Sequence, residues 1–344
     1  MPVTTAVLDP RSDARWLRLV ERAPQTTIFH HPLWLGLVGR HYRYPLAAAA
    51  VLDAAGEAVA GLPLALVASR LTGRRLVALP FSDACPPLVA QDAPADAAQR
   101  LAAAVEDLRR HHGMPVEVRG AFPELALPVD RFHQHRVDLT PGLEEVERAY
   151  TSQVRRNVRK ARREGVEVRR RTDPEALEEF YALHLQTRRR LGVPTQPKAF
   201  VRGLADLLAQ GYGFVSIARL AGRPVAAALF LHAGGTLTYK YGASDPRFQL
   251  ARPNNLLFAD AIAWACEQRL RELDLGRTDF GHDGLRAFKR SWGAAEEPLA
   301  HTYAGGPAPG PGPSLAERVL APVIRRGPAL TGRVIGEVLY RHAG

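Results

Sequence analysis

The sequence predicts an α/β fold of the α+β kind, made of two tandem halves with mixed, mostly antiparallel sheets flanked by helices. The chain has 344 residues, more than the commonest domain size. Segments with strand and helix periodicity alternate along both halves, and a Gly/Pro-rich stretch then sets off a helical tail. We expect a first half at 1–137, a second at 138–304, a linker at 305–313 and a tail at 314–344.

Turn signals and hydrophobic spacing give the elements of the first half. Ala55-Gly56 and Thr72-Gly73 separate strand-like runs, and Leu101 and Val105 lie at near-helical spacing before Gly113. The expected helices are 13–22, 32–41 and 95–112, and the expected strands are 46–51, 58–67, 76–80 and 115–119.

The second half repeats the alternation. Thr140-Pro141 is typical of a helix start, and Gly165 of a helix end, so one helical run is expected between them. Further helices are expected at 174–191, 199–210 and 254–270, and strands at 166–170, 213–220, 224–232, 236–241 and 272–275.

The tail has the pattern of two amphipathic helices. Residues 305–313 fit neither helix nor strand, Ser314 and Glu317 form a capping box, and Gly327-Pro328 divides two apolar stripes flanked by arginines. The tail suits a peripheral contact with an anionic membrane surface. A docked helical pair or a dimer contact explains it equally well.

The net charge of +11 is concentrated in two places. Residues 155–171 hold nine basic residues against two acidic ones, and 305–344 hold five against two. The rest of the chain is nearly neutral, which indicates an anionic partner rather than general solubility.

Several classes of protein are disfavoured. Cys85 and Cys266 are far apart and form no metal or disulfide pattern. No signal peptide or long apolar span is recognisable, so we expect a cytoplasmic protein. The histidines His133 and His135 have no third ligand at metal-site spacing, and no metal is expected.

The basic segment is the first candidate site. On a helix, Arg155, Arg159 and Arg162 or Arg163 share a face, where forked guanidinium groups suit phosphate. A nucleotide-phosphate or tRNA-backbone site is one reading, and a solvated charged face is the other.

Two later segments complete the candidate site. Tyr239 and Tyr241 are expected on one side of a strand, and Asn254 or Asn255 can cap the following helix, whose amides suit an anion. Arg277 and Lys289, in a loop after a short strand, suit a diphosphate or an oxyanion. Ordinary capping and packing are the alternatives for both segments.

These segments together resemble the Fem-like branch of the GNAT acyltransferases. The residues that carry the resemblance are Val154-Arg-Arg-Asn-Val-Arg-Lys-Ala161, Asn254-Asn-Leu-Leu257, Asp274-Leu-Gly-Arg-Thr278, Phe288-Lys-Arg-Ser-Trp-Gly-Ala294 and, in the first half, Pro80-Phe-Ser-Asp83. The resemblance implies two GNAT-like halves around a cleft and transfer of an acyl or aminoacyl group to an amine. It also implies that Lys289 is a site residue and that the basic helix faces the anionic substrate.

The donor is left open. Fem enzymes use aminoacyl-tRNA, with acceptors that carry a nucleotide or undecaprenyl diphosphate. GNAT enzymes that use acetyl-CoA have a glycine-containing pyrophosphate loop, which Arg247-Phe-Gln-Leu-Ala-Arg-Pro-Asn254 lacks. The helical coiled-coil arm of some Fem enzymes is also missing. No bound cofactor is expected, only acyl-CoA or aminoacyl-tRNA as co-substrate.

Acyl transfer needs a neutral amine and donors for the oxyanion. Asp274, Asp279, Asp283 and His282 are candidate bases, and backbone amides of 239–242 are candidate oxyanion donors. The expected catalytic residues are Lys289, Asp274 and Tyr239, and the expected substrate-binding residues are Arg155, Arg156, Arg159, Tyr241, Asn254, Asn255, Arg277 and Trp292.

The acceptor is expected to be anionic and phosphate-bearing, such as a cell-wall or polysaccharide precursor at the inner membrane face, with tRNA as a further possible partner. The alternative function is a non-catalytic basic protein that binds nucleic acid or a membrane surface.

Overall fold

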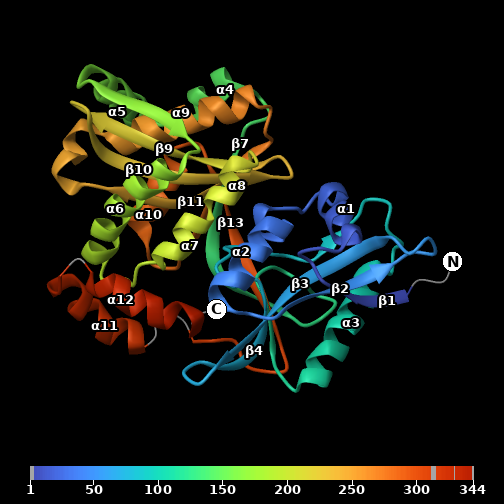
Figure 1. Cartoon of the computed structure of the whole chain (residues 1–344). Coiled ribbons are helices and arrows are strands. Elements are labelled where there is room, and N and C mark those ends of the chain that lie inside the picture. Colours follow the sequence, from blue (N-terminus) through green and yellow to red (C-terminus); the bar gives the residue numbers. More distant parts are fainter. Residues whose placement is uncertain (1–3, 311–314, 329, 343–344) are drawn as a thin grey trace. The chain divides into compact units, whose positions relative to one another are not determined.

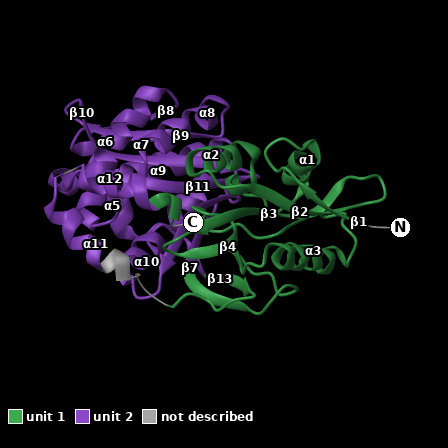
Figure 2. Ribbon diagram, turned by 60° about the horizontal axis from the view of Figure 1, so that its bottom comes forward, with its two compact units in different colours: residues 1–132, 298–311, 340–344 green, residues 133–297, 312–339 purple. Residues whose placement is uncertain are grey.

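The computed structural model describes residues 4–310, 315–328 and 330–342. Contacts divide the chain into two compact units, shown in Figure 2. The first comprises 1–132, 298–311 and 340–344, and the second comprises 133–297 and 312–339. Strands β7 (Pro128–Asp138) and β13 (Ala295–Ala304) each begin in one unit and end in the other.

The first unit is built on a sheet with the order β1-β2-β3-β4-β6-β13, and β5 pairs with β3. Neighbours are antiparallel except β4 and β6. Its strands are β1 (Thr4–Leu8), β2 (Leu46–Leu52), β3 (Ala58–Ser69), β4 (Gly73–Ala78), β5 (Leu88–Val89) and β6 (Val116–Val118). Its helices are α1 (Ala14–Arg22), α2 (Pro32–Tyr42) and α3 (Ala97–His112), with 3-10 turns η1 (Ile28–His30) and η3 (Tyr340–His342).

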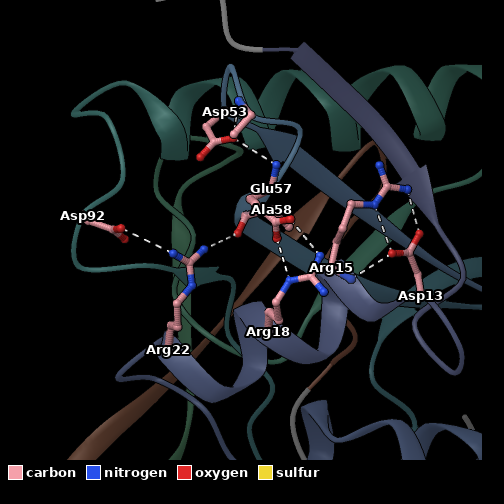
Figure 3. Close-up of polar contacts among 9 residues, drawn as sticks. Asp13, Arg15, Arg18, Arg22, Asp53, Glu57, Ala58 and Asp92 are labelled. Atoms are coloured by element: carbon pink, nitrogen blue, oxygen red, sulfur yellow. Dashed lines mark hydrogen bonds and ion pairs between the residues drawn. The ribbon is translucent and has the colours of Figure 1, made fainter.

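Helix α1 shows how this unit combines a packed face and a paired charged face. Trp16 is fully buried, donates from Nε1 to the His30 carbonyl at 3.0 Å, and packs over Gly61. On the outer face, Arg18 forms a forked ion pair with Glu57, and Arg22 reaches Asp92 (Figure 3). The arginines of α1 therefore have acidic partners.

The second unit is built on the order β7-β12-β11-β10-β9-β8. The pairs β8–β9, β9–β10 and β10–β11 are antiparallel, whereas the pair β11–β12 is parallel. Its strands are β8 (Val166–Arg171), β9 (Gly213–Leu220), β10 (Arg223–Ala233), β11 (Thr236–Ser244) and β12 (Glu272–Asp279). Its helices are α4 (Leu143–Ala149), α5 (Ser152–Arg163), α6 (Pro174–Leu191), α7 (Lys198–Gly203), α8 (Ala205–Ala209), α9 (Pro253–Glu267), α10 (Asp283–Arg290), α11 (Leu315–Arg326) and α12 (Thr331–Leu339), with the 3-10 turn η2 (Pro246–Ala251).

The two units share one plan, which confirms the predicted tandem arrangement. In the first unit, β2, β3 and β4 form an antiparallel meander, and α3 then connects β4 to the parallel strand β6. In the second, β9, β10 and β11 form the meander (Figure 1). Helix α9 then connects β11 to the parallel strand β12. The parallel pair needs a crossover, and a helix supplies it in both units.

Helices cover both faces of the second unit's sheet. Val154 and Val158 of α5 and the apolar residues of α9 share a core cluster with Phe214 and Phe230. On the other face, α6 lies against β10 and β11. This arrangement buries residues from both sides of β9 and β10, in keeping with their nearly continuous apolar sequence.

The tail packs as two helices against α6, as the docked-pair alternative requires. Ile324 is fully buried, the Gly332 carbonyl accepts from the Thr195 amide at 3.0 Å, and the Arg325 guanidinium donates to the Leu191 carbonyl at 3.2 Å. Residues 305–310 form neither helix nor strand. The predicted capping box at Ser314 and Glu317, and linker residues 311–313, lie outside the residues whose conformation and side chains the structure describes.

Several predicted elements need correction. The run expected from Thr140 to Gly165 is two helices, because Thr140-Pro141 lies in a turn and Tyr150 is extended. The expected helix 199–210 also breaks into α7 and α8 at Leu204. The loop expected before Lys289 is helix α10. Strands β1, β5, β7 and β13 were not predicted, since their short, polar or mixed sequences lack a regular alternation.

Replacement of Trp16 and of Arg18 should separate core packing from surface pairing in the first unit. We expect Trp16→Ala to lower the free energy of unfolding by about 3–5 kcal/mol, because it removes a buried ring and leaves a cavity. Arg18→Ala should cost under about 1 kcal/mol, because the ion pair is partly exposed. Urea unfolding measures both values, and equal losses would contradict this division.

Candidate functional site

The site begins where β11 and β12 part. Their parallel register covers only Thr236–Thr238 against Glu272–Asp274, although both strands continue for several residues. Gly276 has φ 74°, a left-handed conformation that glycine adopts without strain, so β12 bends directly after the last pair. The remainder of β11 therefore faces a cleft instead of a neighbouring strand.

The cleft has a volume of about 150 Å³ and lies wholly within the second unit. One wall is formed by Tyr239 and residues 242–244 of β11 together with Ala227 and Ala228 of β10, α9 contributes a second wall, and Phe288 of α10 contributes a third. Thr187 of α6 also reaches the cleft, and its hydroxyl accepts from the Ser244 amide at 3.0 Å. Most of the lining is apolar, so the cleft suits a slender acyl arm.

A β-bulge at Lys240 corrects one expectation. In the pairing with β10, Leu229 lies opposite Tyr241 and Phe230 opposite Tyr239, so Lys240 is an extra residue. The bulge places the two tyrosines on opposite faces of the sheet. Tyr239 packs on Phe258 of α9, with ring centroids 4.8 Å apart, whereas Tyr241 lies near His184 of α6.

Tyr239 is the tyrosine that lines the cleft. A Cβ atom at Gly242 would overlap its hydroxyl, so glycine is needed there for the ring to lie along the strand. Burial raises the pKa of Tyr239 to about 12. The hydroxyl therefore keeps its proton at neutral pH and can donate a hydrogen bond.

The second cavity of the site is a basic groove of about 510 Å³ along α5. We use this name for the groove lined by Gln153, Arg156, Asn157, Arg159, Lys160, Arg163 and Arg252. Val154, Val158 and Ala161 fix α5 to the core, which turns its cations outward. Among the described residues, no carboxylate forms an ion pair with the cations of α5, in contrast to α1.

Arg155 was expected on this ridge and is not part of the groove lining. Its guanidinium turns back and donates to the carbonyls of Arg148 and Tyr150, which end α4. Arg156 lines the groove, and its Nη2 donates to Gln153 at 2.8 Å. Arg159 and Arg163 of the predicted face do line the groove, so Arg155 is the member of that face that turns away from it.

The start of α9 contributes to both the groove and the cleft. Arg252, in a left-handed conformation with φ 59°, lines the groove, and Asn254 lines the cleft. Neither Asn254 nor Asn255 caps the helix, because Arg252 holds the cap position and Pro253 is the first helical residue. Asn255 is buried. The first-turn amides of α9 lie between the two cavities, a favourable place for an anion.

Asp274 lies at the point of divergence. It is buried, Oδ1 accepts from the Gly276 amide at 2.7 Å, and Oδ2 accepts from Gln134 at 3.0 Å. The side chain thus fixes the bend of β12. Asp279, His282 and Asp283, the other candidate bases, are all exposed.

Lys289 is buried and does not line either cavity. From α10 its Nζ donates to the carbonyls of Gly276 at 2.7 Å and Arg277 at 3.0 Å. The ammonium group therefore holds the bent part of β12 while the adjacent Phe288 lines the cleft. The predicted crevice that unites Lys289 with the arginines is instead two separate cavities, whose lining residues Arg252 and Asn254 are two positions apart in the chain.

Two of the expected substrate-binding residues, Trp292 and Arg277, differ in exposure. Trp292 is fully buried, 5.0 Å from Tyr150 and 5.6 Å from Phe258 between ring centroids. It shapes the cleft through Phe258 and has no exposed surface for a substrate. Arg277 is exposed on β12.

A polar cluster near Lys289, of which only His135 is buried, was not predicted. Glu296 accepts from Arg286 at 2.6 Å and lies 2.9 Å from Nε2 of His135. The bond from Arg286 is the main cause that lowers the pKa of Glu296 to about 2, and burial lowers the pKa of His135. His133 and His135 do share a face. Glu296 follows them by more than 150 residues, so only the fold brings them together.

Metal ligands, membrane-spanning helices and cysteines are the remaining features of the described residues. They include no cluster of three or more His, Cys, Asp or Glu residues that could hold a metal ion. None of the described helices is long and apolar enough to cross a membrane. Cys85 and Cys266 are both free thiols.

The matched domain and the fold define the class. Residues 148–290, which include the cleft, the groove and Lys289, match the family model of the acetyltransferase (GNAT) domain. Residues 148–290 are therefore a GNAT acetyltransferase domain, in a chain whose fold is Fem-like, as the sequence motifs predicted. This match supports an acyltransferase over the non-catalytic alternative. No curated protein sequence matches this chain.

Solved structures share the tandem arrangement at low sequence identity. FemX superposes with a TM-score of 0.71 at 15% identity, over 87% of this chain and 96% of FemX. L-PGS from Bacillus licheniformis gives a TM-score of 0.57 at 14% identity, over 92% and 98%. A tandem GNAT protein from the clavulanic acid biosynthesis pathway gives 0.50 at 13%, over 90% and 100%. At these identities the likeness concerns the fold.

Gly242→Ala should damage the cleft selectively. The new methyl group displaces the Tyr239 hydroxyl, so we expect acyl transfer to fall by about 10-fold to 10²-fold, with an unfolding free energy within about 1 kcal/mol of the unaltered protein. Gly36→Ala in α2, where the methyl group meets open space, is the control.

The double variant Gly242→Ala/Tyr239→Phe tests the cause. Removal of the hydroxyl takes away the closest overlap, although the ring Cζ would still lie 2.9 Å from the new methyl group. The rate of the double variant should therefore be much closer to that of Tyr239→Phe alone than to the product of the two single losses. If the double variant instead lost activity by the product of the two single losses, Gly242 would act through another contact.

Proposed function

We propose that this acyltransferase moves an acyl or aminoacyl group from a phosphate-bearing donor to an amine, with the donor's phosphates in the basic groove and its acyl arm in the cleft. The observation that carries the proposal is the junction at the start of α9. Arg252 and Asn254, two residues apart, line the groove and the cleft respectively. A donor with a charged end and a slender reactive end needs these two environments side by side.

The composition of the groove favours aminoacyl-tRNA over acyl-CoA as the donor. Its cations are side-chain groups, four on α5 and one at Arg252, in a groove of about 510 Å³. The loop before α9 contains no glycine, and η2 occupies residues Pro246–Ala251, so a tight backbone cradle for one pyrophosphate is lacking. Guanidinium forks that contact several phosphates in sequence suit a polynucleotide backbone.

Four groups support the chemistry at the cleft. The open backbone of β11 beside the Lys240 bulge presents amides to a bound carbonyl, and Tyr239 can donate a further hydrogen bond to the oxyanion. Asp274 lies at the base of the divergence, where it can orient the attacking amine and accept its proton after its present bonds rearrange. Lys289 supports this wall through the carbonyls of β12 and adds positive charge behind it.

The acceptor is proposed to be an amine on an anionic carrier, such as a cell-wall or polysaccharide precursor. Exposed Arg277 on β12 lies past the bend, where an acceptor phosphate could pair with it. The motifs that resemble the Fem enzymes, whose acceptors carry a nucleotide or undecaprenyl diphosphate, support this choice of acceptor.

A direct assay distinguishes the donors. The protein is incubated with acetyl-CoA or with aminoacyl-tRNA, and amine-dependent release of free CoA or of uncharged tRNA is measured. Release of tRNA supports the proposal in full. Release of CoA alone would keep the enzyme class and overturn the proposed donor, and no release from either would refute the proposed pair of donors.

Arg159→Ala/Arg163→Ala should weaken donor binding and reduce its dependence on salt. Each lost phosphate contact lowers the slope of log affinity against log salt by about 0.7–0.9, so the double variant should lose about 1.5 from that slope with a tRNA donor. Arg15→Ala/Arg18→Ala in α1 is the matched control, because those arginines are paired with carboxylates. An unchanged slope in the groove variant would remove the groove from the donor site.

Lys289→Ala should lower turnover by about 10²-fold, because the ammonium group supports the cleft wall and its charge. Donor affinity should change little, since Lys289 lines neither cavity. Loss of the two carbonyl contacts should also cost about 1–3 kcal/mol of stability. Arg290→Ala, an exposed neighbour on α10, is the control. Wild-type turnover in Lys289→Ala would remove its assignment.

A further inference from the structure

The C-terminal tail has two faces of opposite character. One face packs on the second unit: Ile324 is fully buried, and Gly332 and Gly336 lie against Thr195 so closely that a Cβ at Gly336 would overlap the Thr195 carbonyl. These contacts fix which sides of α11 and α12 turn away from the unit. The other face is apolar and remains exposed.

We call this exposed face the apolar stripe. Its members are valines and a leucine that are each at least half exposed: Val319, Val323, Leu330, Val334 and Val338. On α12, Val334 and Val338 follow the packed Gly332 and Gly336 by two residues, or roughly 200° around the helix, so they point away from the unit. In α11, Val319 and Val323 share a side by their four-residue spacing.

Arginines flank the stripe along the chain, and others end α6, against which α11 packs. Arg325 and Arg326 end α11, and Arg189 and Arg190 end α6, where Gly192 touches α11. Arg333 lies on α12 and forms an ion pair of 3.8 Å with Glu337. Apart from Glu337, the tail side chains that the structure describes include no carboxylate.

The combination points to one kind of partner. We infer that the apolar stripe inserts into the interface of an anionic lipid bilayer while the flanking arginines contact lipid phosphates. Apolar residues opposed to arginines on short helices are typical of segments that lie in a membrane surface, and basic residues are attracted to anionic leaflets. A second copy of the chain fits less well, because pairing two stripes would bring the arginines of both copies together.

The inference is independent of the transfer chemistry. The stripe lies on 315–339, outside the matched acetyltransferase domain, and none of its members lines the cleft or the groove. Membrane attachment would bring the enzyme to lipid-linked or membrane-associated acceptors without any change in the site. Loss of attachment should therefore leave the transfer rate on soluble substrates unchanged.

Vesicle flotation with the full chain tests the inference. The probes are vesicles of phosphatidylcholine alone and vesicles in which about one third of the lipid is phosphatidylglycerol. We expect binding to the anionic vesicles that weakens as salt is raised. The variant Val334→Glu/Val338→Glu should lower the bound fraction by at least about tenfold, and Arg326→Ala should weaken binding less.

A matched control and a second readout keep the test decisive. Val7→Glu changes an equally exposed valine of β1 and should leave vesicle binding intact. Circular dichroism verifies that each variant is folded, and light scattering reports association in solution. Failure of the unaltered protein to bind anionic vesicles would overturn the inference, as would full binding by the Val334→Glu/Val338→Glu variant. A dimer that the same variant dissolves, without vesicle binding, would assign the stripe to a second copy.

Discussion

The divergence of two parallel strands is the constraint on which the rest of the site depends. After Thr238 and Asp274, β11 and β12 stop pairing. Asp274 accepts from the Gly276 amide, Gly276 adopts a positive φ, and Lys289 holds the carbonyls that follow. Sheet backbone that lacks a neighbouring strand needs another hydrogen-bond partner. The oxygen of a bound carbonyl group can accept a hydrogen bond from the backbone amides of β11 beyond its last pair with β12. The gap between the two strands thus removes sheet hydrogen bonds and provides a binding site.

The contrast between α1 and α5 shows that the number of arginines on a helix does not identify a ligand site. Arg15, Arg18 and Arg22 of α1 all reach carboxylates, so their charge is neutralised within the first unit (Figure 3). The cations of α5 have no such partners among the described residues, and they surround a hollow. Unneutralised charge around a cavity, rather than basic composition alone, indicates that an anion binds there.

Sequence patterns predicted much of the fold, because the meanders of both units have clear turns and apolar runs. The helix of residues Pro174–Leu191 and the strand of residues Gly213–Leu220 have the predicted bounds. Strand β7 was missed because Asp130, Arg131 and the following polar residues mask its alternation. The enzyme class could also be predicted, because the motifs of the second half resemble those of one branch of acyltransferases.

The geometry of the site was less accessible, for definable reasons. A single extra residue, Lys240, reverses the face of every later side chain on β11, and periodicity alone gives no sign of a bulge. Arg252 contributes to the groove from a loop about 90 residues after α5. Thr187, Phe288 and Gln134 join the site only through the fold. Long-range convergence of this kind is not encoded in local spacing.

Amide hydrogen exchange with and without donor tests the central claim most directly. The account predicts that aminoacyl-tRNA, added in the absence of an amine acceptor, slows exchange in residues 239–244 of β11 and in the first turn of α9, with a further effect along α5. Donor turnover accompanied by unchanged exchange in these segments, and by protection elsewhere in the chain, would contradict the account.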